Sequence, residues 1–146
     1  MKKSSVQKKP KTLLEVFYPV KSEYEEQVKI FEWAEIAKNE FPELEMLVGS
    51  LNGVRLSIGL AVKSKKAGLK RGYPDIGLDV KRSSRLEPLR QFGGLRIELK
   101  KANGGKLSPD QMWWLQNLTA QGFRAICCWG AARAIREITS YLEGRF

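Results

Sequence analysis

The sequence predicts an α/β sandwich in which helices flank a mixed central sheet, and three observations support this fold class. Helical and extended segments follow one another in the order helix, strand, helix, strand, strand, helix, strand, helix. Two of the helical segments begin with complete capping signals. The 146 residues suit one domain with its own hydrophobic core, and the chain contains no internal repeat.

The chain begins with a strongly basic segment. Residues 1–11 carry five lysines and almost no apolar side chains, which is typical of a disordered tail ahead of a single domain over residues 12–146. Across the chain, 26 Lys and Arg face 16 Asp and Glu, giving a net charge of +10. This excess favours a polyanionic partner, most simply nucleic acid, although a basic surface without such a partner is the alternative.

A helix and a strand follow the tail. Ser22 and Glu25 form a capping box at the start of a helix predicted over 22–41, where apolar residues recur at helical spacing. Pro42 ends this helix. The apolar segment 44–51 is predicted as a strand because a turn dipeptide follows it directly.

The middle of the chain reads as a second helix and a strand hairpin. A helix is predicted over 55–68, with Gly68 as its C-terminal cap. Alternating apolar residues predict strands over 75–80 and 93–101. The polar, basic segment 81–92 between them is predicted as a mobile hairpin connection.

The last third contains the clearest helix signal. Ser108 and Gln111 form a capping box at the start of a helix over 108–122. The apolar segment 123–130 suits a fully buried strand, and a closing helix is predicted over 131–142.

Composition excludes several classes of site. Histidine is absent, which removes histidine bases, histidine triads and most zinc sites. Cys127 and Cys128 are neighbours, so they cannot readily bridge each other and are too few to enclose a metal; they suit small buried residues in a reducing cytoplasm. No apolar run approaches the roughly 18 residues of a membrane span, and no signal-peptide pattern follows the basic start, so we expect a soluble, cytoplasmic protein.

The strand over 93–101 raises the question of function. Leu95, Ile97 and Leu99 point to one face of the strand, which looks like core. The charged residues between them, Arg96, Glu98 and Lys100, point to the other face. That second face is either a solvated surface or a site.

Asp75 offers a second carboxylate for such a site. If the strands that contain Asp75 and Glu98 pair, their Cβ atoms lie about 4.5–5.5 Å apart or one diagonal step further. Converging carboxylates suit Mg²⁺ or Mn²⁺, and Lys100 beside them can orient an attacking water and stabilise charge on a phosphate. The alternative is a cross-strand ion pair on a solvated face.

The spaced motifs resemble the virus-type replication-repair nuclease (VRR-NUC) domain of the PD-(D/E)xK superfamily. The resemblance runs through "SEYEEQ", "NGVR", "KAGLKRGYPDIGL", "LRIELKKANGGKLSPDQMWWLQNL" and "GFRAICCWGAARAIREITSYL", in the order of the family. It implies a restriction-endonuclease-like α/β sandwich of the stand-alone phage and bacterial type. It also implies Mg²⁺ or Mn²⁺ as cofactor, branched DNA such as Holliday junctions as substrate, and a homodimer.

The resemblance also implies roles for individual residues. Asp75, Glu98 and Lys100 match the metal and catalytic triad, with the Leu99 backbone carbonyl as a further metal ligand. Gln111 would complete the site, although its place in a capping box gives it another purpose. A helix-one glutamate near the metal is implied as well. Glu23 fits it best and Glu26 is the substitute, whereas either can be an ordinary first-turn acid.

Further residues match positions that would touch DNA. They are Asn52, Arg55, Lys70, Arg71, Gly72, Lys101 and Lys106, with Lys63, Lys65 and Lys66 nearby. Ordinary turn chemistry also explains Asn52 and Gly72, and each cation alone suits a solvated surface.

The sequence therefore predicts a metal-dependent DNA endonuclease. A non-catalytic DNA-binding module that kept the fold is the first rival, and an α/β protein with another partner is the second. Joint presence of Asp75, Glu98 and Lys100 argues against the first rival, because a module without catalysis has no need of all three.

Overall fold

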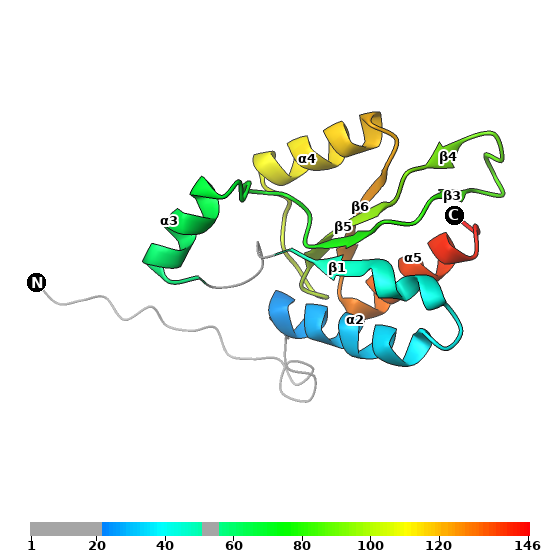
Figure 1. Cartoon of the computed structure of the whole chain (residues 1–146), viewed down its shortest axis with the longest axis horizontal. Coiled ribbons are helices and arrows are strands. Elements are labelled where there is room, and N and C mark those ends of the chain that lie inside the picture. Colours follow the sequence, from blue (N-terminus) through cyan, green and yellow to red (C-terminus); the bar gives the residue numbers. More distant parts are fainter. Residues whose placement is uncertain (1–21, 51–55) are drawn as a thin grey trace, which may run out of the picture.

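The computed structural model describes residues 22–50 and 56–146 (Figure 1). The basic tail and the candidate DNA-binding residues Asn52 and Arg55 lie outside this range. None of the helices within it is long and apolar enough to cross a membrane.

A four-stranded mixed sheet forms the centre of the molecule. Its strands lie in the order β1 (Leu47–Gly49), β2 (Ile76–Leu78), β5 (Leu95–Lys100) and β6 (Arg124–Trp129). The pairs β1–β2 and β2–β5 are antiparallel, whereas β5 and β6 are parallel. The parallel pair is possible because helix α4 (Pro109–Ala120) provides the crossover between its two strands.

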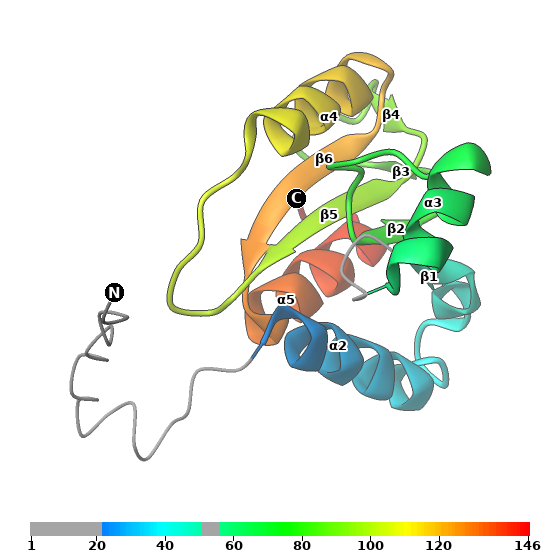
Figure 2. The ribbon, with the colours of Figure 1, turned by 90° about the vertical axis from the view of Figure 1, so that its left-hand side faces the viewer.

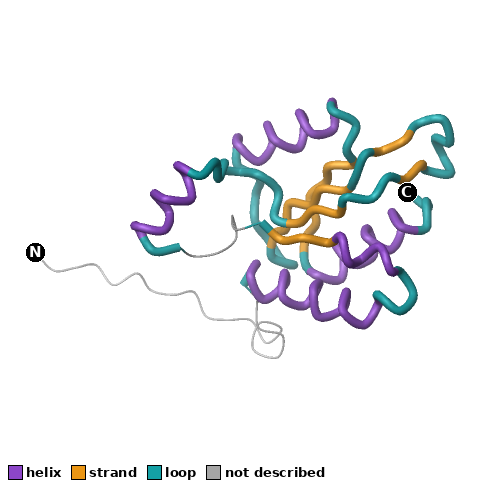
Figure 3. Tube along the Cα trace, in the orientation of Figure 1, coloured by secondary structure: helices purple, strands orange, loops and turns teal. Residues whose placement is uncertain are grey.

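Helices cover both faces of this sheet. Helices α2 (Glu23–Ala37) and α5 (Ala131–Leu142) pack on one face, and α4 packs over β5 and β6 on the other (Figures 1 and 3). Helix α3 (Ile58–Lys66) stands apart from these layers and buries none of its residues. The arrangement confirms the predicted α/β sandwich.

The hydrophobic core lies between the sheet and the α2–α5 layer. Leu95, Ile97 and Leu99 of β5 are at most 1 % exposed and belong to one cluster with Ile30 of α2 and Ile138 of α5. Burying each such aliphatic side chain stabilises the fold by about 1.5–3 kcal/mol. The predicted alternation of β5 is therefore correct for its core face.

The helix starts follow the sequence signals. Ser22 and Ser108 each accept a hydrogen bond from the backbone of the third helical residue, and that residue's side chain accepts one in return, so both capping boxes are present. Helix α3 is shorter than predicted: it begins after Ser57, whose hydroxyl accepts from the Leu60 amide.

The strand predicted over 44–51 is mostly wrong. Pro42–Met46 forms a 3-10 helix (η1), and within the described part of this segment, up to residue 50, the strand is Leu47–Gly49. Pro42 at the first position supplies a φ angle that suits a helical turn, and Leu44 turns into the core with 1 % exposure. An apolar run alone did not distinguish a buried turn from a strand.

The connection over 81–92 is a hairpin, as predicted, but it is anchored at its base. Strands β3 (Arg82–Ser83) and β4 (Gln91–Phe92) pair with each other. Arg82 Nε donates to the Leu142 carbonyl at 3.0 Å, and the Phe92 ring lies 5.3 Å from that of Phe146. These contacts tie the hairpin base to the C-terminal segment.

Strand β6 is not fully buried, contrary to the prediction. It lies at the edge of the sheet, where Trp129 remains 44 % exposed and Cys128 is the one fully buried residue of the strand. Both cysteines are free thiols. Burial raises the pKa of Cys127 to about 11 and that of Cys128 to about 12, so neither is a ready thiolate nucleophile.

Candidate active site

Two carboxylates meet where β2 begins and β5 ends. The β2–β5 register pairs Ile76 with Ile97, so one further step places Asp75 opposite Glu98. Asp75 Oδ2 accepts a hydrogen bond from the Leu99 amide at 2.8 Å. Asp75 is 8 % exposed and Glu98 2 %, which places both carboxylates inside the protein rather than on a solvated face.

Lys100 lies beside this pair. Its Nζ is 3.0 Å from Glu98 Oε1, and the residue is 6 % exposed. Loop residues cover its alkyl chain: a Cβ added at Gly105 would lie 3.3 Å from Lys100 Cδ. The indole N–H of Trp129 donates to the Gly105 carbonyl at 3.2 Å and holds this loop in place. The ion pair is thus buried, which excludes the solvated cross-strand pair considered from sequence.

Gln111 both caps its helix and contacts Glu98. Its Oε1 accepts from the Ser108 amide at 2.8 Å, which completes the capping box, while its Nε2 donates to Glu98 Oε1. The amide can turn only one way here, because a reversed amide would set its NH₂ group against the Ser108 N–H. The cap of α4 therefore also fixes the Glu98 carboxylate.

The structure separates the two candidate acids of the first helix. Glu23 lines the pocket that contains Asp75 and Glu98. Glu26 points elsewhere: it is 7 % exposed, and its Oε2 accepts from the Ala131 amide at 2.8 Å, at the first residue of α5. A carboxylate at that position stabilises the start of α5, because it accepts from a backbone N–H that has no partner within the helix and lies at the positive end of the helix dipole.

The electrostatics of the pair are those of crowded, desolvated acids. Burial, followed by the charge of Asp75, raises the pKa of Glu98 to about 7. Burial also raises the pKa of Asp75, although the Leu99 N–H and the Lys100 charge oppose the shift. For Lys100, burial alone would lower the pKa, but the hydrogen bond and charge of Glu98 raise it above the ordinary value. The site thus holds a cationic lysine next to two acids that resist ionisation together.

Asp75 and Glu98 border a pocket of about 300 Å³. Figure 2 looks onto the molecule with β5 between α4 and α2. The acidic and polar side chains that line the pocket are Glu23, Asp75, Glu98, Ser108 and Gln111. Arg71, Gly72 and Tyr73 complete its wall. Elements from four parts of the chain therefore meet at one opening.

The turn before Asp75 packs closely against the start of α4. Gly72 has a φ of +78°, and an added Cβ would lie 2.7 Å from Asp110 Cβ and 2.9 Å from the Gln111 nitrogen. Arg71 also pairs with Asp110 at 3.2 Å. The Trp114 indole N–H donates to the Arg71 carbonyl at 3.1 Å. Gly72 is therefore required for the packing of the wall, whatever it does towards a substrate.

The remaining candidate cations lie on the surface. Lys70, Arg71, Lys101 and Lys106 are exposed, and three more lysines, Lys63, Lys65 and Lys66, occupy the last turn of α3. Arg71 is the one of these that lines the pocket.

The sequence did not single out several residues that shape the site. Tyr73 and Ser108 line the pocket, and Gly105 with Trp129 covers Lys100. The two adjacent glycines ahead of Lys106 are a local signal for the loop. No local signal indicates the tertiary contact of this loop with Trp129.

The donor set fits a hard divalent cation. Among the residues that the structure describes, no three His, Cys, Asp or Glu side chains gather closely enough to enclose a metal ion. Two converging carboxylates do suffice for Mg²⁺ or Mn²⁺, which keep several positions for water and phosphate oxygens. Burial raises the pKa of both Asp75 and Glu98, and a divalent cation between them would favour their ionised forms.

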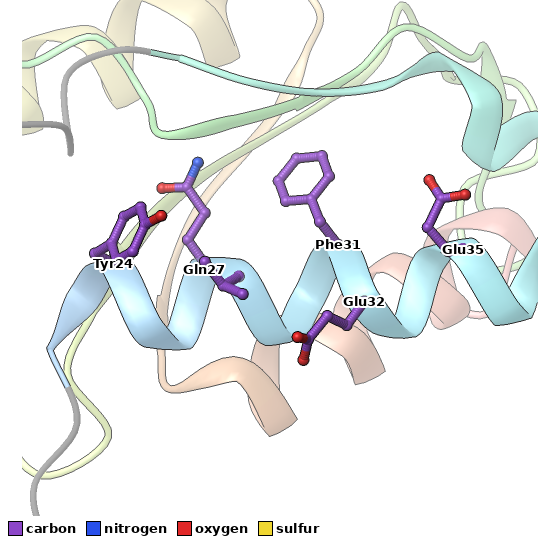
Figure 4. Close-up of a pocket in the computed structure, with 6 residues that line it drawn as sticks. Tyr24, Gln27, Phe31, Glu32 and Glu35 are labelled. Atoms are coloured by element: carbon purple, nitrogen blue, oxygen red, sulfur yellow. The ribbon is translucent and has the colours of Figure 1, made fainter.

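A different hollow, of about 390 Å³, lies along α2. Figure 4 shows Gln27, Phe31 and Glu35 on one side of the helix, with Tyr24 near its start. The hollow is bordered by apolar side chains and by the acidic Glu32 and Glu35, and it contains none of the candidate catalytic residues described above.

Comparisons with known proteins identify a family and a similar fold. The profile of the VRR-NUC domain matches residues 20–132. A solved structure described as a VRR_NUC domain protein is similar to this chain with a TM-score of 0.67 and 26 % sequence identity, over 86 % of this chain and 91 % of that one. No curated protein matches the chain.

Proposed function

The chain belongs to the VRR-NUC domain family, and we propose that it is a metal-dependent endonuclease that hydrolyses phosphodiester bonds in DNA. The observation that carries the proposal is the meeting of two buried carboxylates, Asp75 and Glu98, at one pocket, with the buried Lys100 paired to Glu98. Burying two acids and an amine together is costly, and a stability role alone gives no reason for it.

The carboxylate oxygens of Asp75 and Glu98, with the Leu99 carbonyl, are the groups that would hold Mg²⁺ or Mn²⁺. Such an ion, when bound, polarises the phosphate and favours deprotonation of the attacking water. Hydrolysis then forms a bond between the water oxygen and phosphorus and breaks the bond from phosphorus to one sugar oxygen.

Lys100 and Gln111 would act on the geometry and charge of this step. Lys100 keeps its proton on Nζ, because the neighbouring acids raise its pKa. It is therefore a donor towards negative charge that grows on the phosphate, rather than a base. Gln111 donates to Glu98 Oε1, the same oxygen that Lys100 contacts, and so would help to hold the carboxylate in position. Arg71 lines the pocket and would contact a phosphate of the bound strand.

The test is cleavage of labelled DNA with Mg²⁺, with Mn²⁺ and with a chelator. The proposal requires cutting with at least one of the two ions and none with the chelator. Cutting at the same rate in chelator would contradict metal dependence. Salt-sensitive DNA binding without cutting under any condition would instead favour the non-catalytic DNA-binding module.

We further propose selectivity for branched DNA and a homodimeric state, both of which rest on likeness to the stand-alone members of the family. Comparing a four-way junction, a flap and a linear duplex tests selectivity, and equal rates on all three would contradict it.

For the dimer, the α2 hollow is the surface we assign to a second copy. Tyr24 is 59 % and Val28 36 % exposed there, and the acidic border disfavours DNA. Light scattering should give a dimer for the parent chain and a monomer for Val28→Glu. A parent chain that is monomeric at all concentrations would contradict the assignment.

A further inference from the structure

A second pocket lies next to the candidate active site. It has a volume of about 250 Å³, and Tyr73 lines both pockets. Its other walls include Val48 of β1, Pro74, and the β2 residue Gly77. The size is below the roughly 300–1,000 Å³ of pockets for drug-sized ligands, and it suits one planar ring system.

The two pockets lie along the same strand face. Asp75 and Gly77 are two residues apart, so they point to the same side of the sheet with a spacing of about 7 Å. Stacked nucleotides in a DNA strand are separated by about 3.4 Å. A strand with one phosphate at Asp75 therefore brings the adjoining nucleotides within reach of the second pocket.

An ion pair between a buried arginine and an exposed aspartate forms the polar part of this pocket. Arg96 Nη2 is 2.6 Å from Asp79 Oδ1, and Arg96 Nη1 donates to the Leu95 carbonyl at 2.9 Å. The guanidinium also lies 4.5 Å from the centre of the Phe123 ring. Arg96 is 9 % exposed, whereas the Asp79 side chain is 56 % exposed. The pair carries no net charge and offers both hydrogen-bond donors and acceptors. It therefore favours the edge of a neutral base over a phosphate.

Gly77 keeps the floor of the pocket open. A Cβ added there would lie 3.4 Å from Arg96 Nη1 and 3.5 Å from Val48 Cγ2, so even a methyl group would occupy the space between them. Tyr73 supplies an aromatic wall, and its ring is fixed by an edge-on contact with Trp114 at 5.0 Å. Aromatic and apolar walls around a hydrogen-bonding floor are what a planar base requires.

We propose that this second pocket receives an unstacked nucleobase of the DNA strand, next to the phosphate that is cut. The inference rests on the proposed nuclease function. Taking a base out of a duplex costs a few kcal/mol, and least where the base is already unpaired. The pocket thus provides a physical reason for preferring DNA with unpaired nucleotides beside the cut, as at branch points.

The test is a binding measurement in chelator, so that it does not depend on cleavage. The dissociation constant of a single-stranded deoxyoligonucleotide is compared, at one salt concentration, with that of the same strand carrying abasic sites in its centre. Base stacking of the usual strength gives about tenfold tighter binding of the strand with bases. Val48→Trp fills the pocket and should reduce this ratio to about one.

The matched control is Met46→Trp, which adds the same indole at an exposed residue outside the pocket and should keep the tenfold ratio. Gly77→Ala is a milder second variant and should lower the ratio in the same direction as Val48→Trp. Equal binding of both strands by the parent chain, or a base preference that Val48→Trp leaves intact, would overturn the proposal that this pocket receives a base. A base preference without any metal-dependent cutting would support the pocket and overturn the proposed function instead.

Discussion

The raised pKa of Glu98 predicts that binding of a divalent ion releases a proton. With a pKa of about 7, Glu98 is about nine-tenths protonated at pH 6, half protonated at pH 7 and one-tenth protonated at pH 8. An ion that binds the carboxylate must displace this proton. Proton release should therefore fall from about 0.9 to about 0.1 per ion over this range.

The same linkage sets the pH dependence of ion affinity. Between pH 6 and pH 8 the apparent affinity for Mn²⁺ should rise about tenfold, which corresponds to about 1.4 kcal/mol. Titration calorimetry in two buffers of different ionisation enthalpy measures both quantities. Glu40→Gln, an exposed acid after α2, is the matched control and should leave the proton release unchanged. Binding of Mn²⁺ at pH 6 with no proton release, and with an affinity that does not change by pH 8, would refute the reasoning.

Three further predictions concern individual groups of the site. Lys100→Ala should lower the rate of DNA cleavage at least a hundredfold and leave DNA binding in chelator largely intact. Unimpaired cutting would refute the role of Lys100. Gln111→Glu keeps the capping box but removes the donor to Glu98 and adds a negative charge, so the cleavage rate should fall at least tenfold. Circular dichroism should show that α4 is intact. An unchanged cleavage rate would show that the Glu98 contact is dispensable. In the ion-free folded protein the pKa of Glu98 is about 7, above its ordinary value of 4.5, so the free energy of unfolding should fall as pH rises from about 4.5 to 7. Glu98→Gln should reduce this loss by about 1–2 kcal/mol, after allowance for solvent in the open pocket. Urea unfolding curves measure the effect, and identical curves for parent and variant across pH 5–8 would contradict it.

Local signals predicted the parts of the fold that depend on neighbouring residues. Ser22 and Ser108 begin their helices as expected, because a capping box satisfies backbone N–H groups within one turn. The alternation of β5 follows from the strand repeat, so the sequence alone was enough to predict that Glu98 and Lys100 share a face. Their proximity to Asp75 required only the pairing of adjacent strands.

Other features depend on tertiary contacts that sequence alone does not contain. Strand β6 reads as a central strand, but its place at the sheet edge is set by the order of all four strands. Glu23 and Glu26 carry the same side chain within one turn of helix, and only the position of α5 assigns Glu26 to a helix start and leaves Glu23 at the pocket. The second pocket draws its walls from β1, from the turn before β2 and from the Arg96–Asp79 pair, so it depends on the packing of several segments and could not be predicted from local signals.

The central claim is that Asp75 and Glu98 hold a divalent ion beside Lys100. A crystal grown or soaked with Mn²⁺ tests it most directly, because manganese gives an anomalous scattering signal. The account predicts one strong anomalous peak between the two carboxylates, within bonding distance of the Leu99 carbonyl. Manganese peaks at other positions, with none between Asp75 and Glu98, would contradict it.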